Sequence, residues 1–281
     1  MRDERPETAN YQSARERHRV EEGPRFQEER LMQVFFTLTR RELATYFVSL
    51  TGYVIIAAAT LLVGTSFVVL LRNIGNESSS MAITEIFYLT PFFWIILLLA
   101  TPVITMRLFA LEKYSGTYET LMTTPVSDGQ VVSAKFTAAW LFYLIMWLPM
   151  LACLYVVQHF ARQSGALEPG IVGGMYLGIA LVGALFLSLG CLASALTSSQ
   201  MVAAMVSLTF GVGLFTLAFL PERMEAGAPW QAQVLAGFAL FRQLHDFARG
   251  VVDTRAVVFF LSLTFFFLFL TLRVVESRRW K

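Results

Sequence analysis

Residues that could do chemistry are few in this 281-residue chain, and most lie between positions 107 and 135. A nucleotide-binding P-loop needs a Gly-rich turn followed by Gly-Lys-Ser or Gly-Lys-Thr. Lys113 follows Glu112, and Lys135 precedes Phe136, so neither lysine fits this pattern. We therefore expect that the chain is not an enzyme and binds no cofactor of its own, so that any nucleotide-driven work would need another polypeptide.

The residues with metal-binding side chains are scattered. His18, His159 and His245 are far apart in the sequence and lie in predicted loops, whereas a metal site needs several ligands that converge. Cys153 and Cys191 lie in apolar stretches, which is typical of buried small side chains. The sequence predicts neither a metal site nor a disulfide framework.

The polar segment at 107–135 has a pattern of its own. The Ser-Gly-Thr stretch at 115–117 can break a helix, and its threonine is a candidate N-cap. Residues 117–122 then predict a short helix with Glu119 in the first turn, where an acidic side chain suits the helix dipole. Pro125 would end this helix, and Ser-Asp-Gly at 127–129 predicts a turn. Such a helix could act as a lever on the flanking spans, or it could be an ordinary capped loop helix.

The elements around this segment are membrane spans. The chain is 56% hydrophobic and 15% charged, against about 25% charged in a soluble domain. A span needs about 20 apolar residues, so the fold class is an all-α polytopic membrane protein with six transmembrane helices, at about 50–71, 86–106, 136–158, 172–194, 201–220 and 256–272. These spans contain essentially no ionisable residue, which argues against a proton-coupled pump or a charged channel filter.

The region before the first span divides into a tail and a helix. Residues 1–30 alternate Arg and Glu without an apolar face, which predicts a disordered or loosely helical cytoplasmic tail. A partner-binding arm is the alternative. An interfacial helix is predicted next, with a face at helical spacing followed by two arginines: Leu31, Val34, Phe35, Leu38, Arg40 and Arg41. The alternative is a helical extension of the first span.

The last two connections also have distinct patterns. A polar stretch at 194–200 predicts a tight hairpin between the fourth and fifth spans, and the many glycines of the fourth span favour close helix packing over a substrate path. The loop at 221–255 predicts one or two short amphipathic helices at the interface, because aromatic and aliphatic residues recur at threes and fours: Phe238, Phe241, Leu244, Phe247 and Val251.

The charge distribution predicts the orientation. Six spans place both termini on one side of the membrane. Sixteen of the 22 Lys and Arg residues would lie on that side and six on the other. The positive-inside rule therefore places the N- and C-termini in the cytoplasm of a cell-membrane protein. No basic stripe with interleaved aromatics points to nucleic acid.

A resemblance becomes specific in the polar segment. The pattern Glu112-Lys113-x-x-Gly116-Thr117-x-Glu119-x-Leu121-x-x-x-Pro125-Val126 resembles the signature that follows the second span of ABC-2-type transporter permeases. The layout of spans over about 31–275 agrees with that family, with a short cytoplasmic tail at 276–281. The segment 244–263 is similar to the gliding-motility-type and copper-processing-type branch.

The resemblance implies a transport role. In that family the cytoplasmic helix is a coupling helix that docks on a separate ATPase subunit, so Glu112, Lys113, Gly116, Thr117, Glu119, Leu121 and Pro125 would form or shape the contact. Leu111 and Tyr114 depart from the more charged family pattern and would make the docking surface more apolar. The expected partners are two ATPase subunits that hold ATP and Mg²⁺, a second permease subunit, membrane lipid and an extracytoplasmic auxiliary protein. The loop at 221–255 would shape an outer gate through Phe238, Phe241, His245, Phe247, Arg249, Gly250 and Asp253.

Two other functions stay open at this stage. A membrane enzyme or assembly factor would need polar residues that converge at one membrane face, and the sequence shows none. A non-transporting membrane anchor for an extracytoplasmic complex predicts that no ATPase copurifies with the chain. The sequence does not indicate the substrate of an exporter.

Overall fold

The computed structural model describes residues 24–76, 87–88, 90–116, 127–161, 169–223 and 240–279. The regular secondary structure in these ranges is helical, which confirms the predicted all-α class. In chain order the helices are α2 (Pro24–Val48), α3 (Leu50–Asn76), α5 (Pro91–Thr105), α6 (Ala110–Ser115), α8 (Asp128–Met146), α9 (Pro149–Ala161), α10 (Pro169–Leu196), α11 (Gln200–Arg223), α13 (Leu240–Ala248) and α14 (Thr254–Arg279).

Six segments of the described chain are long and apolar enough to cross a membrane, as predicted. They are Leu50–Arg72, Pro91–Ser115, Asp128–Val156, Pro169–Leu196, Gln200–Ala218 and Thr254–Ser277. The sixth span was predicted to be short, but α14 has 26 residues. The helix can continue past the apolar stretch because Arg273 and Glu276 form an exposed ion pair at 2.9 Å on its surface.

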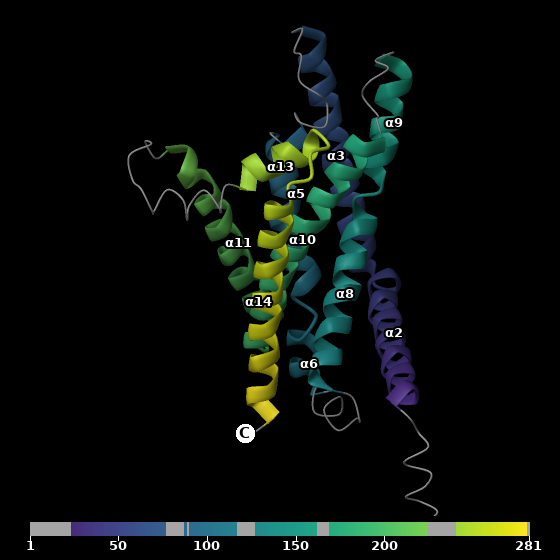
Figure 1. The fold of residues 1–281 in the computed structure, drawn as a ribbon, viewed down its shortest axis with the longest axis vertical. Helices are drawn as coiled ribbons and strands as arrows, with labels where there is room; N and C mark the ends of the chain where they lie inside the picture. Colours follow the sequence, from purple (N-terminus) through teal and green to yellow (C-terminus); the bar gives the residue numbers. More distant parts are fainter. Residues whose placement is uncertain are drawn as a thin grey trace, which may run out of the picture.

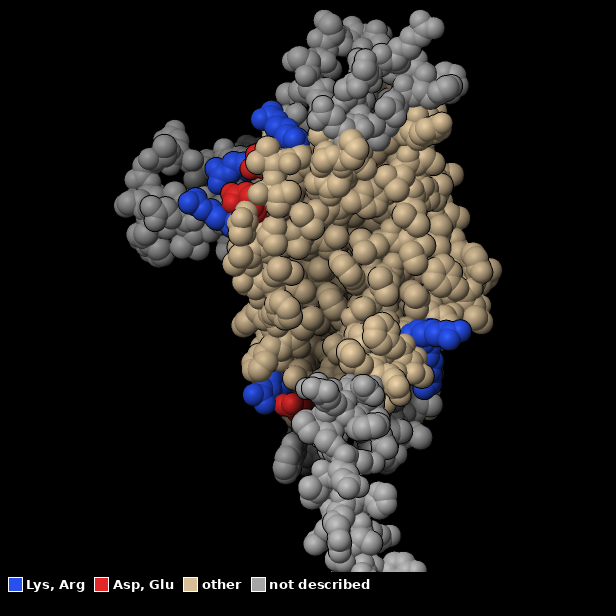
Figure 2. Space-filling view, turned by 45° about the vertical axis from the view of Figure 1, so that its right-hand side comes forward, with Lys and Arg blue, Asp and Glu red and all other residues tan. Residues whose placement is uncertain are grey.

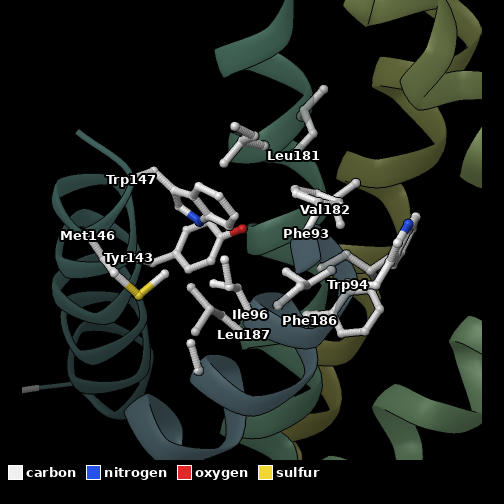
Figure 3. Packing of buried hydrophobic residues seen from close by; sticks show 14 of the residues in the cluster. Phe93, Trp94, Ile96, Tyr143, Met146, Trp147, Leu181, Val182, Phe186 and Leu187 are labelled. Carbon is white, nitrogen blue, oxygen red and sulfur yellow. The ribbon is translucent and has the colours of Figure 1, made fainter. Parts of the chain in front are cut away.

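Helix α10 lies at the centre of the bundle and packs on α5, α8, α11, α13 and α14 (Figure 1). Its glycines allow these close contacts. A Cβ atom on Gly183 would lie 2.1 Å from the Tyr143 ring, and one on Gly190 would lie 2.1 Å from the Thr105 hydroxyl oxygen. Figure 3 shows large side chains of α5, α8 and α10 pointing toward one another at this centre. The glycine-rich span therefore serves packing, as favoured from the sequence.

The start of the third span differs from the prediction. The expected turn at 127–129 is wrong: Ser127 is the N-cap of α8, and Asp128 and Gly129 are already helical. Ser127 and Gln130 form a capping box, in which each side chain accepts a hydrogen bond from the other residue's backbone N–H. Lys135 therefore lies inside α8, whereas the predicted span at 136–158 began just after it.

The region before the first span is also more helical than predicted. Helix α2 begins at Pro24, so residues 24–30 belong to this helix rather than to the predicted tail; residues 1–23 lie outside the described chain. A bend at Ser49 separates α2 from α3. The backbones of the two helices approach closely there, and this approach requires glycine at position 52. A Cβ atom on Gly52 would lie 2.0 Å from the Tyr46 carbonyl oxygen.

Charged side chains gather near the two ends of the bundle. Figure 2 shows charged side chains near both ends of the visible face and an uncharged band between them. Helix α6, the start of α2 and the C-terminus lie at one end, called the α6 end below, and α9 and α13 lie at the other (Figure 1). Both ends of the described chain are thus on the same side, as an even number of spans requires.

Candidate functional site

The polar segment after α5 forms a short helix held by its neighbours. Helix α6 ends at Ser115, and Gly116 adopts a left-handed conformation with φ of 73°, as expected from the helix-breaking Ser-Gly-Thr stretch. The first residues of the helix lack a cap from their own side chains. Instead, the N–H groups of Phe109 and Ala110 both donate to Ser194 Oγ of α10, each at 3.1 Å.

A second contact joins α6 to the same end of α10. The Lys113 ammonium donates a hydrogen bond to the backbone carbonyl of Ala195, in the last turn of α10. A cation is favourable there because the helix dipole places partial negative charge at the C-terminal carbonyls. Lys113 and Ser194 therefore fix both the side and the start of α6 against α10.

The third contact is a buried cluster of charges. Lys135 Nζ of α8 lies 2.6 Å from Glu112 Oε1 of α6 and 3.1 Å from Glu42 Oε1 of α2. The lysine side chain is only 3% exposed, and the two carboxylates are 21% and 17% exposed. A lysine this buried needs partners, since an unpaired charge in such a place is very costly. We call Glu42, Glu112 and Lys135 the charge cluster.

The charge cluster lies on the wall of a cavity of about 300 Å³ between α2, the start of α3, α6 and α8. The residues around it are Arg41, Glu42, Thr45, Tyr46, Ser49, Thr51, Gly52, Arg107, Leu108, Leu111, Glu112 and Lys135. Arg107 donates from Nη1 to Ser49 Oγ at 3.1 Å, and its Nε is buried without a hydrogen-bond partner among the described residues. Burial raises the pKa of the Tyr46 hydroxyl, with Glu42 adding to this rise, so the hydroxyl stays neutral and donates to the Ile104 carbonyl at 3.0 Å.

The residues predicted for ATPase coupling are distributed over two faces of α6. Glu112 and Lys113 point to the interior contacts described above, whereas Leu111 is 40% and Tyr114 80% exposed. The predicted helix at 117–122 with Thr117, Glu119 and Leu121, together with Pro125, lies outside the described residues. Within the described part, the large exposed side chains of α6 are therefore the aliphatic Leu111 and the aromatic Tyr114.

The predicted interfacial residues lie on α2, with Val34, Phe35 and Leu38 half-buried and Arg40 and Arg41 exposed. The side chain of Leu31 is outside the described set. The residues of α2 that pack against the core are Leu43, Tyr46 and Phe47, beyond the predicted apolar face. Tyr46 stacks on Phe142 of α8 with ring centroids 4.7 Å apart.

The predicted outer-gate residues lie at the opposite end. Phe247 is buried and Phe241 half-buried on α13, and Trp94 of α5 contacts Phe241 at 4.5 Å between centroids. Gly250 adopts a φ of 77° in the turn after α13, and Asp253 accepts a hydrogen bond from the Arg255 N–H at the start of α14. The prediction also named His245 and Arg249 of the same segment, and Phe238, which lies outside the described residues.

Sequence reasoning missed Glu42, Arg107, Lys135 and Ser194 as site residues. Their signals are weak in one sequence: each lies many positions from its partner, and only the packing of α2, α6, α8 and α10 brings them together. A clue for Lys135 exists, since a lone lysine eight residues after a good N-cap signal falls inside the helix that follows.

The bundle and its uncharged band define a multi-pass membrane protein. No group of three or more His, Cys, Asp or Glu residues in the described part could hold a metal ion. A model of the family described as ABC-2 family transporter protein matches residues 65–274, so the chain belongs to this family of membrane transport components. Such membrane components typically lack catalytic activity and work with an ABC ATPase. No curated protein matches the chain.

Proposed function

We propose that the chain is the permease subunit of an ATP-driven exporter, and that α6 passes the motion of a separate ATPase to the spans. The observation that supports this most strongly is the attachment of α6. Glu112 pairs with Lys135 of α8, and through Lys135 with Glu42 of α2, while Lys113 and Ser194 bind α6 to α10. A force on α6 would therefore reach three helices at once.

The division of α6 into two faces suggests how it works. Tyr114 and Leu111 have their side chains exposed and available to a partner, whereas Glu112 and Lys113 are engaged inside the subunit. The acidic and basic residues of the motif would thus position the helix and transmit force, and the aromatic and aliphatic residues would make the contact. Thr117, Glu119, Leu121 and Pro125 would extend the contact on the next segment.

The transport cycle follows from this arrangement. ATP and Mg²⁺ would be held by two ATPase subunits, whose closure pushes the α6 helices of two permease subunits. Because interfaces and packed cores are bistable, a small shift at α6 can become a rearrangement of whole helices. Helix α13 and Gly250, at the opposite end, would belong to the outer gate that opens in response.

The remaining assignments belong to the same proposal. The positive-inside count supports a cytoplasmic location for the α6 end. The permease domain would cover residues 31–275, with α2 extending it to Pro24, between the N-terminal segment and the tail at 276–281. The branch suggested by residues 244–263, gliding-motility-type and copper-processing-type, belongs to this proposal, as does an extracytoplasmic auxiliary protein as a further partner.

The test is copurification of an ATPase with the tagged full-length chain from native membranes, detected as ATP hydrolysis and as a Walker A peptide in mass spectra. Tyr114→Ala and Leu111→Arg should each reduce the recovered ATPase at least fivefold, with the permease still monodisperse. Tyr155→Ala is the matched control, because Tyr155 is 67% exposed on α9 at the opposite end. Recovery of no ATPase with the wild-type chain would favour the alternative, a non-transporting anchor for an extracytoplasmic complex.

A further inference from the structure

A second hollow adjoins the cavity at the charge cluster. It has a volume of about 210 Å³ and lies between α3 and α5, lined only by apolar side chains: Val54, Ile55, Ala58, Ala59, Leu62, Ile96, Leu99, Ala100 and Val103. Three alanines keep this groove open, and Val54 and Leu99 at its edges are 57% and 54% exposed. The groove therefore faces the outside of the bundle.

The two hollows follow one another along α3 and along the chain that leads from α5 into α6. On α3 the polar cavity includes Thr51 and Gly52, and the apolar groove begins at Val54. On the other wall the groove ends at Val103, and the cavity includes Arg107. On each wall, the last residue of one hollow is separated from the first residue of the other by about one helical turn of 5.4 Å or less. Together they form a surface with a charged end and an apolar end.

The dimensions match one membrane leaflet. From Val54 to Leu62 the groove rises about 12 Å along α3, at 1.5 Å per residue. One leaflet contributes about 15 Å of hydrocarbon, half of the ~30 Å core. The groove thus has room for most of one acyl chain, and the polar cavity lies where the headgroup of that lipid would be.

The charges of the cavity favour an anion. Lys135 is engaged by both carboxylates, Glu42 and Glu112. No described carboxylate lies within ion-pair distance of Arg107, and its buried Nε has no hydrogen-bond partner in the described chain. Arg41 is exposed at the same cavity. A guanidinium with a free N–H edge suits phosphate oxygens, which it can bind with two parallel hydrogen bonds.

We propose that this surface binds a membrane phospholipid with an anionic headgroup, whose phosphate contacts Arg107 and Arg41 and whose acyl chain fills the α3–α5 groove. The lipid would lie against the bend between α2 and α3, beside the charge cluster. The proposal is independent of the ATPase, because it rests on the cavity, the groove and the unpartnered arginine nitrogen alone. A second copy of the chain is the competing occupant of the groove.

The headgroup test uses the full-length protein purified in detergent and equilibrated with equal amounts of phosphatidylglycerol and phosphatidylcholine. Native mass spectrometry then counts the lipid retained on each chain. We expect a preference for phosphatidylglycerol that falls about fivefold for Arg107→Gln and at least tenfold for Arg41→Gln/Arg107→Gln, since each basic residue near an anionic surface contributes about a factor of five. Arg40→Gln is the matched control, an exposed arginine of α2 outside the cavity.

The acyl-chain test fills the groove without touching the arginines. Ala58→Phe should abolish lipid retention, whereas Ala57→Phe, on an exposed position of α3 that does not line the groove, should retain it. Both variants keep Arg107, so inorganic phosphate at millimolar concentration should still bind the headgroup site in each. Equal retention of the two lipids by the wild-type protein would overturn the proposal. So would loss of self-association by Ala58→Phe with unchanged lipid retention, because a second copy would then occupy the groove.

Discussion

Replacement of Lys135 by methionine tests the charge cluster directly. Methionine keeps most of the side chain's volume but removes the cation that lies 2.6 Å from Glu112 and 3.1 Å from Glu42. Both carboxylates are then left facing one another in a largely buried site. Breaking a fully buried pair costs about 3–5 kcal/mol and breaking an exposed pair up to about 1 kcal/mol. Because the lysine is buried and the carboxylates are partly exposed, we expect Lys135→Met to lower the free energy of unfolding by about 3 kcal/mol.

The magnitude of the pairwise coupling follows from a double-mutant cycle. Glu112→Gln alone should lower the free energy of unfolding by about 2 kcal/mol, because it leaves Lys135 with only one carboxylate partner. The second carboxylate oxygen, Glu112 Oε2, is buried without a hydrogen-bond partner in the described chain. Once Lys135 is methionine, neutralising Glu112 removes a stranded charge. The double variant should therefore be no less stable than Lys135→Met, which corresponds to a coupling energy of about 2 kcal/mol.

The assay is reversible unfolding of the purified full-length chain in mixed micelles with increasing sodium dodecyl sulfate, followed by tryptophan fluorescence. The matched control is the same cycle on Arg273→Gln and Glu276→Gln. In the wild-type protein these two residues form an ion pair of 2.9 Å, with side chains that are 63% and 36% exposed. That cycle should show a coupling of at most about 0.5 kcal/mol. Additive losses for Glu112 and Lys135, within about 0.5 kcal/mol, would refute the buried cluster.

Three further predictions concern stability. Ser194→Ala should lower the free energy of unfolding by about 1–3 kcal/mol in the same assay, because two buried N–H groups lose their acceptor; an effect below about 0.3 kcal/mol would contradict this role. Gly183→Ala should lower the free energy of unfolding by about 1–3 kcal/mol, because its Cβ would push on the Tyr143 ring. Gly213→Ala is the control and should be neutral or stabilising, because a Cβ there meets nothing within 4 Å. Equal effects of the two substitutions would show that the close approach of Gly183 to Tyr143 is absent. Burial raises the pKa of Tyr46, so its neutral hydroxyl contributes to the free energy of unfolding below the ordinary tyrosine pKa of about 10, and this contribution is lost as pH rises above that value. The fall in stability of the wild-type protein at alkaline pH should therefore be smaller in Tyr46→Phe. Identical dependence of stability on pH in the two proteins would contradict this role.

Much of the fold could be predicted from the sequence because the bilayer imposes a simple requirement. A stretch of about 20 apolar residues must form a helix, since lipid offers no partner for exposed backbone groups. The six spans and the break at Gly116 follow from this requirement and from glycine's tolerance of positive φ. The turn predicted at the start of α8 was wrong because Ser-Asp-Gly suits both a turn and a helix N-terminus. The Gln130 side chain favours the helix, because it completes the capping box with Ser127.

The site could be predicted only in part. The motif around Glu112 and Lys113 indicated the segment that carries the candidate site, but not the direction in which its side chains point. That direction depends on Lys135, Glu42 and Ser194, which come from three other helices. Helical periodicity does not encode contacts between residues so distant in sequence. A buried lysine also contradicts the rule that charges mark span ends, and only its two carboxylate partners explain it.

We propose that α6 and α2 move as one unit when a partner ATPase acts. This can be measured without knowledge of the substrate, as the distance between spin labels on Ser115→Cys of α6 and Arg40→Cys of α2, both at exposed positions. The measurement uses the complex with its ATPase and a chain in which the half-buried Cys153 is replaced by alanine. Pulsed electron resonance would compare the nucleotide-free state with the state trapped by ATP and vanadate. We expect the distance to be the same in the two states of the otherwise wild-type protein and to differ between them after Lys135→Met. A distance that changes equally in both would contradict it.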